Sequence, residues 1–169
     1  MRNCLKSFIS VFLVLTFVFG VCLAGKAAAQ GVAVKKRLPA PDFKLQDTYQ
    51  DIVALKDYKG EQPVLLFFWT TWCPFCEREL SVLNNAYQNL VKDGIELLAI
   101  NAGELPDTVT NFIQDFNLAY RVLLDRDTGI SSAYGVVGVP TYVLVDKAGN
   151  IVFKDNYFPQ REYKALLAK

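Results

Sequence analysis

The feature that most constrains the fold is an uninterrupted apolar run, Val64 to Trp69, followed almost at once by two cysteines and a helix-patterned segment. Such a run has the length of a strand that is buried on both faces of a sheet. Ile95 to Ile100 is a second run of this kind. Between the two runs, apolar residues recur at helical spacing and an Asp-Gly pair ends the pattern: Leu80, Leu83, Tyr87, Leu90, Val91, then Asp93 and Gly94. The order strand, helix, strand predicts a right-handed crossover between two parallel central strands.

The segments around this unit predict a mixed sheet. Asp107 is expected to cap a helix that looks inserted after the second central strand. The other expected elements are an N-terminal hairpin (Phe43, Leu45 and 52–55), a strand over 122–124, a helical turn or two over 130–134, a hairpin over 142–145 and 151–154, and a short helix over 161–168. We therefore expect an α/β fold in which helices flank both faces of a central mixed sheet.

The chain has 169 residues, which suits one globular domain. Its first 29 positions are typical of an export signal: Arg2 and Lys6 precede an apolar stretch over 8–24, and three alanines follow it. That stretch also approaches the length of a membrane span, so residues 1–29 are expected to be either a cleaved signal peptide or an anchor. Both place the globular part outside the cytoplasm. Residues 30–40 are expected to be a linker, and 41–169 the domain.

The charge balance does not suggest a nucleic-acid surface. The chain carries 18 Lys and Arg against 17 Asp and Glu. Three of the basic residues and none of the acidic ones fall within positions 1–29, which leaves 15 against 17, or −2, for the rest. No basic run is longer than Lys35-Lys36-Arg37. We expect no nucleic-acid partner.

The exported part contains only two cysteines, Cys73 and Cys76, in a C-x-x-C pair. A pair at this spacing can close a disulfide and reopen it. A closed zinc site needs four ligands, and the chain has no histidine and no second cysteine pair, so we expect no metal. Without histidine, no Cys-His dyad or Ser-His-Asp triad can form. A purely structural disulfide remains an alternative, although so short a loop constrains the unfolded chain little.

The expected position of the pair explains how it would react. A cysteine at the start of a helix faces unpaired backbone N–H groups and the positive end of the helix dipole, which favour its thiolate. Pro74 suits the first helical position because it needs no hydrogen bond there. Cys76, one turn later, would be more buried and would attack the mixed disulfide. The residues thus predict Cys73 as the nucleophile and Cys76 as the resolving thiol.

Three motifs together resemble the thioredoxin superfamily: Pro41-Asp42-Phe43, the run from Phe68 to Cys76, and Gly138-Val139-Pro140-Thr141. More narrowly, the chain is similar to exported thiol-disulfide oxidoreductases of the TlpA/ResA/DsbE type, relatives of the AhpC/TSA family. The resemblance covers roughly residues 39–168. It implies a thioredoxin-like fold, with an N-terminal hairpin and a helical insertion after the second core strand, and no bound cofactor.

The resemblance also implies roles for residues around the cysteines. The proline matching Pro140 is cis in the superfamily, and its loop packs over the disulfide. Val139 would then pair with a bound polypeptide by strand addition. We expect Trp72, Pro74 and Phe75 to contact the substrate, whereas Trp69 continues the buried strand.

One position departs from ordinary thioredoxins. These often carry a buried acid six residues before the first cysteine, and here that position is Phe67. Another acid would have to transfer protons to and from the cysteine thiols. Our candidate is Glu104, which follows the second central strand where ResA-like proteins carry a glutamate. A partly buried carboxylate there could exchange protons with the thiols.

The resemblance implies a reductant that acts in the periplasm or on the outer face of the cytoplasmic membrane. Its substrates would be protein disulfides, with the haem-site cysteines of apocytochromes c as the leading case. A membrane protein of the CcdA/DsbD type would supply electrons. Two alternatives stay open: a thiol peroxidase, since Thr70 and Cys73 have the Thr-x-x-Cys spacing of peroxiredoxins, and a non-enzymatic binding or chaperone module.

Overall fold

The centre of the fold is strand β4 (Val64–Trp69), in which every residue is buried. The computed structural model describes residues 37–168. Within this part of the chain, β4 pairs parallel with β5 (Glu96–Ala102) and antiparallel with β7 (Thr141–Val145). Strands on both sides and packed layers on both faces explain why β4 is apolar throughout. The expected central strand is confirmed.

In the described residues, eight strands form one mixed sheet in the order β1-β8-β7-β4-β5-β6-β2-β3. Strands β4, β5 and β6 run parallel, and the remaining pairs are antiparallel. The other strands are β1 (Leu38–Pro39), β2 (Lys44–Asp47), β3 (Ile52–Ala54), β6 (Arg121–Asp125) and β8 (Asn150–Asp155). The helices are η1 (Leu55–Tyr58), α2 (Pro74–Lys92), α3 (Pro106–Phe116), α4 (Gly129–Ala133) and α5 (Gln160–Leu167).

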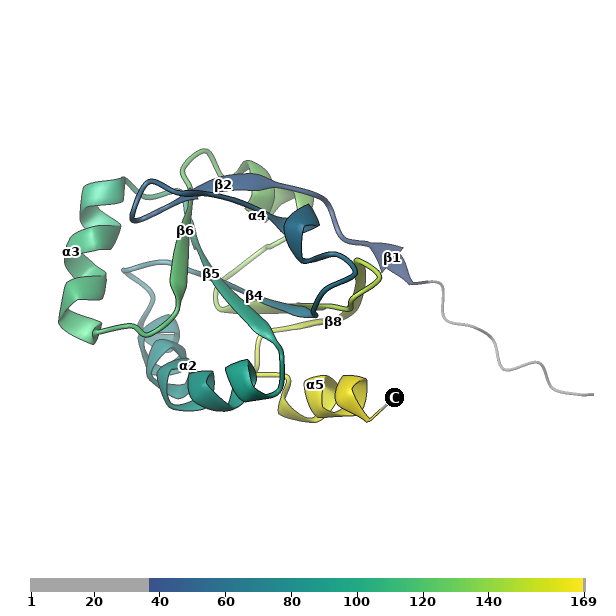
Figure 1. The fold of residues 1–169 in the computed structure, drawn as a ribbon. Coiled ribbons are helices and arrows are strands. Elements are labelled where there is room, and N and C mark those ends of the chain that lie inside the picture. The colour runs from purple at the N-terminus through teal and green to yellow at the C-terminus, as the bar shows by residue number, and fades with distance from the viewer. Residues whose placement is uncertain (1–36, 169) are drawn as a thin grey trace, which may run out of the picture. The chain divides into compact units, whose positions relative to one another are not determined.

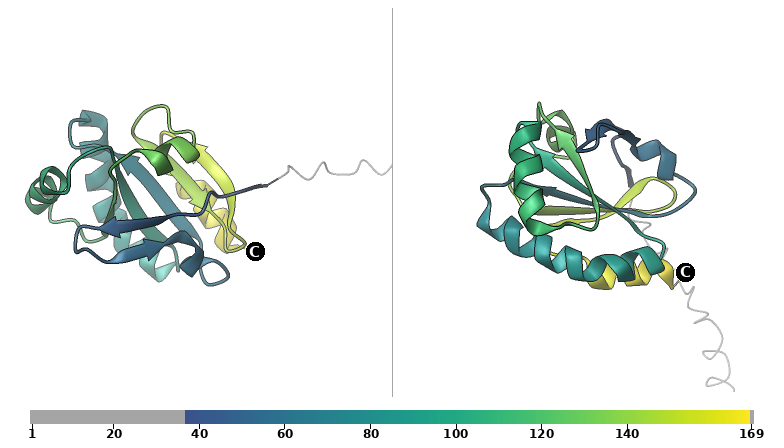
Figure 2. Two further views of the ribbon diagram at one scale, coloured as in Figure 1. Left: turned by 90° about the horizontal axis from the view of Figure 1, so that it is seen from above. Right: turned by 60° about the vertical axis from the view of Figure 1, so that its left-hand side comes forward.

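Helices cover both faces of the sheet, as Figures 1 and 2 show. Alternate residues of β4 point to opposite faces. Phe67 and Trp69 belong to the core cluster under α2, α3 and α5. Leu66 and Phe68 belong to a second cluster, which the β2–β3 hairpin, η1 and α4 cover. The predicted α/β fold with a mixed sheet between helices is therefore confirmed, including its N-terminal hairpin.

Helix α2 begins directly beyond β4. Cys73 is its N-cap residue and Pro74 its first residue. The helix buries one face, made of Cys76, Leu80, Leu83 and Leu90, against the sheet. It ends where Gly94 adopts a φ of +69°, a backbone conformation that glycine takes without steric penalty. The central strand thus delivers the first cysteine to a helix N-terminus.

Helix α3 starts differently from our expectation. Its N-cap residue is Leu105, which makes no side-chain capping hydrogen bond, and its first residue is Pro106. The prediction that Asp107 caps this helix was therefore wrong. Pro106 begins the helix because its φ is already helical and it has no N–H to satisfy. Asp107 lies inside the first turn, where its carboxylate is close to the positive end of the helix dipole.

The sheet begins earlier in the chain than the expected domain boundary. Leu38 and Pro39, which we placed in the linker, form β1 and pair with Ile151 and Asn150. The chain joins the sheet at the end where β4 starts, beside the turn between β7 and β8. The predicted signal peptide or anchor and most of the predicted linker lie outside the described residues. In residues 37–168, none of the helices has the length and apolar character needed to cross a membrane.

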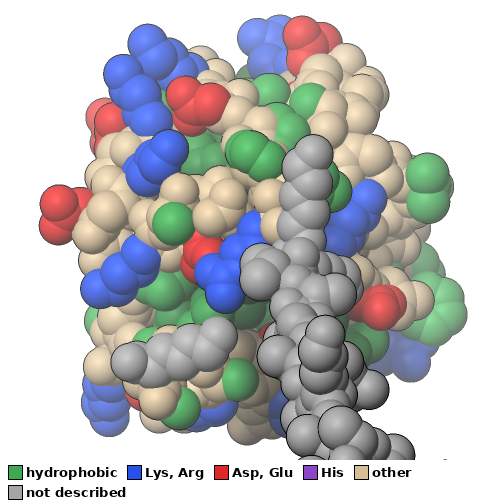
Figure 3. All heavy atoms as spheres, turned by 90° about the vertical axis from the view of Figure 1, so that its right-hand side faces the viewer, with side chains coloured by type: hydrophobic (Ala, Val, Ile, Leu, Met, Phe, Trp, Pro, Cys, Tyr) green, Lys and Arg blue, Asp and Glu red, His purple; other side chains and the backbone are tan. Residues whose placement is uncertain are grey.

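Charge is dispersed on the face next to β1. In the visible part of this face, Lys and Arg side chains are separated by acidic side chains, backbone and small apolar areas (Figure 3). Arg37 pairs with Asp146 at 2.7 Å there, and its side chain is half exposed. An exposed ion pair of this kind contributes roughly 0–1 kcal/mol, so we expect the two apolar clusters to supply most of the stability.

We expect Leu83→Ala to lower the free energy of unfolding by about 2–5 kcal/mol, because Leu83 is fully buried under α2 and its truncation leaves a cavity. Val82→Ala is the matched control on the same helix, because its side chain is 43% exposed. This control should change stability by no more than about 0.5 kcal/mol. Urea unfolding of both variants measures the difference, and equal losses would contradict the described face of α2.

Candidate active site

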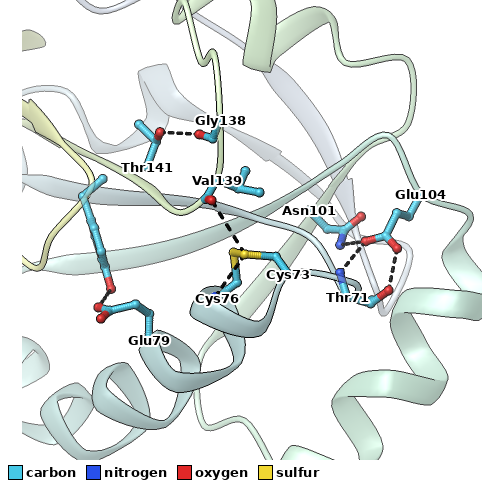
Figure 4. The surroundings of a disulfide bond; sticks show 10 residues. Thr71, Cys73, Cys76, Glu79, Asn101, Glu104, Gly138, Val139 and Thr141 are labelled. Atoms are coloured by element: carbon cyan, nitrogen blue, oxygen red, sulfur yellow. Dashed lines mark hydrogen bonds between the residues drawn. A yellow bond between two sulfur atoms is a disulfide. The ribbon is translucent and has the colours of Figure 1, made fainter.

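The site is built around a disulfide between Cys73 and Cys76 (Figure 4). The two Cα atoms are 5.2 Å apart. Cys73 is 5% exposed and Cys76 is 0% exposed, so the second sulfur is the more deeply buried, as the sequence predicted. The arrangement leaves Cys73 as the sulfur that a partner molecule can reach first.

The N-terminus of α2 polarises the Cys73 sulfur. Sγ of Cys73 accepts a hydrogen bond from the backbone N–H of Cys76 at 3.1 Å. It also lies at the positive end of a helix of 19 residues. Both interactions stabilise negative charge on sulfur once the disulfide is reduced. Local structure alone thus provides what a nucleophilic cysteine needs.

The loop before β7 packs against the disulfide. The Val139–Pro140 peptide bond is cis, as the resemblance implied. The carbonyl oxygen of Val139 lies 3.7 Å from Sγ of Cys73. Beside it, the Thr141 hydroxyl donates to the carbonyl oxygen of Gly138 at 2.7 Å, which fixes this loop to the start of β7. The structure therefore brings Val139 and Pro140 to the cysteines.

Glu104 lies at the same end of the sheet but is bonded to the loop that precedes Cys73. Its carboxylate accepts hydrogen bonds from the backbone N–H of Thr71 at 2.7 Å and from the Thr71 hydroxyl at 2.5 Å. The side-chain amide of Asn101 donates a third at 2.6 Å. Among the described residues, no hydrogen bond joins Glu104 to either sulfur. Its contacts are those of a group that ties the β4–α2 loop to the end of β5 (Figure 4).

Phe67 occupies the position where a thioredoxin carries its acid, and it is fully buried. Its ring lies 4.8 Å from the ring of Tyr142, which follows the cis proline by two residues. The Tyr142 hydroxyl donates to a carboxylate oxygen of Glu79 at 2.6 Å. Sequence reasoning missed Glu79. Its spacing of three residues from Cys76 on a helix was the signal, because residues three apart on a helix share a face.

A groove of about 470 Å³ runs beside the disulfide. One wall comes from α2 and the other from the Val139–Pro140 loop, and its lining includes Phe75, Arg78, Glu79, Val137 and Asn156. The expected contact residues Trp72 and Phe75 are 71% and 64% exposed, and Pro74 is exposed as well. Exposed aromatic side chains next to a reactive sulfur are typical of a binding surface. Phe75 is the one of these exposed aromatic residues that lines the groove.

The described part of the site is not arranged for metal binding. Within residues 37–168, no three side chains of His, Cys, Asp or Glu gather closely enough to hold an ion. The carboxylates near the sulfurs are already engaged, Glu104 with Thr71 and Glu79 with Tyr142.

Comparisons with known proteins agree with this geometry. The AhpC/TSA family model matches residues 37–154. The thiol-disulfide oxidoreductase ResA of Geobacillus thermodenitrificans is 37% identical over 141 residues, which cover 83% of this chain and 80% of that protein. ResA of Bacillus subtilis is 33% identical over 84% of this chain and 79% of its own length.

A solved structure supports the same assignment. The crystal structure of a putative thiol:disulfide interchange protein DsbE from Chlorobium tepidum matches with a TM-score of 0.71 at 25% identity. The match covers 78% of this chain and 96% of that one. The chain therefore belongs to the AhpC/TSA family and is, like its ResA relatives, a thiol-disulfide oxidoreductase with a thioredoxin-like fold.

Proposed function

We propose that this oxidoreductase reduces disulfides of polypeptides outside the cytoplasm through the Cys73–Cys76 couple. The observation that carries the proposal is the position of the Cys73 sulfur, which accepts the Cys76 N–H at the start of α2. The hydrogen bond and the helix dipole favour the thiolate, the form that attacks a disulfide. Cys76, buried behind it, is in place to resolve the product.

The reaction has two exchange steps. The Cys73 thiolate attacks one sulfur of the substrate disulfide, so that a mixed disulfide forms and the other substrate sulfur leaves as a thiolate, which takes up a proton. Cys76 then loses its proton and attacks the Cys73 sulfur. The Cys73–Cys76 disulfide forms and the second substrate thiolate leaves. Two electrons pass from the enzyme dithiol to the substrate.

The groove beside the disulfide supports a polypeptide substrate. Val139 borders it with its carbonyl oxygen close to the Cys73 sulfur, and a backbone group there can pair with an extended chain by strand addition. Phe75 lines the opposite wall, and Trp72 and Pro74, which flank Cys73 in the chain, are exposed as well. A segment that carries a disulfide would thus lie across the reactive sulfur.

Three features support thiol-disulfide exchange in an oxidising compartment, and the second of them favours the reducing direction. The sequence before the domain has the charge and apolar pattern of an export signal or anchor. The Pro74-Phe75 pair adds no positive charge that would strongly stabilise the thiolate and make a strong oxidant. The ResA relatives are named as thiol-disulfide oxidoreductases. The substrate we propose is the haem-site disulfide of apocytochromes c, with a membrane dithiol donor of the CcdA/DsbD type restoring the enzyme.

We expect Cys76→Ser to accumulate mixed disulfides in the producing cell, because Cys73 can still attack but nothing releases the product. Non-reducing gels and mass spectrometry of the trapped partners measure this, and we expect apocytochrome c among them. Cys73→Ser is the matched control and should trap nothing.

Two outcomes would contradict the proposal. Rapid consumption of hydrogen peroxide by the reduced enzyme would favour the peroxidase alternative, to which the Thr70-x-x-Cys73 spacing points. Full function of Cys73→Ser would instead favour a binding module whose disulfide is structural. An insulin-reduction assay run beside a peroxide assay separates these results.

We expect Glu104→Gln to lower kcat/KM for protein disulfides by roughly 10-fold, because a displaced β4–α2 loop misplaces Cys73. A glutamine cannot accept from all three donors that Thr71 and Asn101 now direct at the carboxylate. Thr71→Val removes only one of these hydrogen bonds and should have a smaller effect. If Glu104 instead exchanges protons with the thiols, Glu104→Gln will change the pH profile of the reaction and Thr71→Val will not.

We expect Trp72→Ala to raise KM for a protein disulfide by about 5- to 30-fold, the range for losing about 1–2 kcal/mol of apolar contact. The rate with a small aromatic disulfide should change less, because such a molecule has no polypeptide segment to pack on the exposed Trp72 ring. Tyr49→Ala is the control, since Tyr49 is exposed in the β2–β3 turn and belongs to neither wall of the groove. A uniform loss with both substrates would indicate a displaced Cys73 rather than a lost contact.

A further inference from the structure

Lys154 on β8 connects this strand to the turn that precedes the cis peptide bond. Its ammonium group donates hydrogen bonds to the carbonyl oxygens of Tyr134 at 2.8 Å and of Gly135 at 2.6 Å. Tyr134 is the C-cap residue of α4, where the last carbonyl groups of a helix have no partner within the helix. A cation at this end of a helix also interacts favourably with its dipole. The lysine therefore holds the backbone at the point where α4 ends.

The backbone conformation of this turn suits the contact. Gly135 has a φ of +61°, which favours glycine, and a Cβ at this position would lie 3.4 Å from Nζ of Lys154. The N–H of Gly135 donates to the carbonyl oxygen of Ser132 at 2.9 Å, and that of Val136 donates to the carbonyl oxygen of Ser131 at 2.9 Å. The chain thus leaves α4 through a hydrogen-bonded turn whose next carbonyl groups face the lysine.

The same turn is also attached to the beginning of the domain. The Tyr134 hydroxyl donates to the carbonyl oxygen of Pro41 at 2.7 Å, and its ring lies 6.5 Å from the ring of Phe43. These contacts hold the tyrosine side chain, whereas Lys154 holds its carbonyl group. Lys154 pairs in the sheet with Val143, so its contact joins the turn to the hairpin that follows the cis proline.

The segment between this turn and the cis peptide bond is short. Residues 136–138 lead to Val139, whose carbonyl oxygen lies 3.7 Å from Sγ of Cys73. Near the other end of the loop, the Thr141 hydroxyl donates to the carbonyl oxygen of Gly138 (Figure 4). A short segment that is held at both ends has little conformational freedom to lose when a partner binds to it.

We propose that Lys154 is a positioning residue for polypeptide substrates, which fixes this loop so that the Val139 backbone is in place for strand addition before the substrate binds. The inference rests on the proposed function and adds to it a residue that acts on substrate affinity. No contact between Lys154 and the substrate is involved, because its effect passes through the carbonyl groups of Tyr134 and Gly135. Without the lysine, the loop would have to become ordered during binding, which weakens binding.

The test is Lys154→Met, which keeps an unbranched side chain and removes the ammonium group. We expect KM for insulin, reduced with a fixed concentration of a dithiol donor, to rise about 3- to 10-fold, the range for ordering about one more position on binding. We expect kcat to stay within about 2-fold, because Cys73 and Cys76 are unchanged. The rate with a small aromatic disulfide should also stay within about 2-fold, because such a molecule has no polypeptide backbone to pair with Val139.

Two further variants show whether the lysine acts through its hydrogen bonds. Lys147→Met is the matched control, because Lys147 is exposed in the turn at the other end of the same hairpin, and it should leave KM unchanged. Lys154→Arg keeps a cation that can donate to both carbonyl groups, so it should restore most of the affinity for insulin. Urea unfolding of each variant gives the folded fraction to which the kinetic constants are referred.

Three results would overturn the role of Lys154. These are an unchanged KM for insulin in Lys154→Met, an equal rise in Lys147→Met, and an equal loss of rate with insulin and with the small disulfide. The proposed function is tested separately by the unmodified enzyme. If that enzyme does not reduce protein disulfides, the proposed function fails. If it does and Lys154→Met has the same KM, only the role of Lys154 fails.

Discussion

The site depends on one junction, where a fully buried strand ends and a long helix begins at a cysteine. β4 can lie at the centre of the sheet only because both of its faces are apolar, and this fixes the place at which the chain leaves the core. Cys73 caps α2 within a few residues of that point, so its sulfur accepts the N–H of Cys76 and lies at the positive end of the helix dipole. The cis Val139–Pro140 loop packs against this junction, and Glu104 ties the loop before Cys73 to the end of β5.

Two carboxylates, those of Glu104 and Glu79, lie near this junction, and they share no hydrogen-bond partner. Glu104 acts on the chain before Cys73, since its hydrogen bonds go to Thr71 and Asn101. Glu79 lies on the helix after Cys76 and is held by Tyr142. The two acids are thus bonded to different parts of the chain, Glu104 to the loop before Cys73 and Glu79 to Tyr142 on β7.

The sequence predicted the elements whose chemistry is local. The apolar run of β4, the spacing of apolar residues in α2 and the C-x-x-C pair each report on neighbours in the chain, and the structure has them as expected. The prediction that Asp107 caps α3 was wrong because Pro106 also favours the start of a helix. The sequence pattern alone does not show which of the two residues determines where α3 begins. The Glu79–Tyr142 hydrogen bond joins residues 63 positions apart, so no periodic pattern in the sequence predicts it. Only the register of β7 against β4 brings Tyr142 under α2.

Strand β1 fixes the place where the described chain enters the sheet. It attaches the beginning of the domain beside Asn150 and Ile151, at the end of the sheet where Val64 pairs with Val145. The disulfide lies at the other end of β4, a separation of roughly 20 Å for six extended residues. The point where the described chain enters the sheet and the disulfide therefore lie at opposite ends of β4, so whatever precedes Arg37 joins the domain at the end of this strand remote from Cys73 and Cys76.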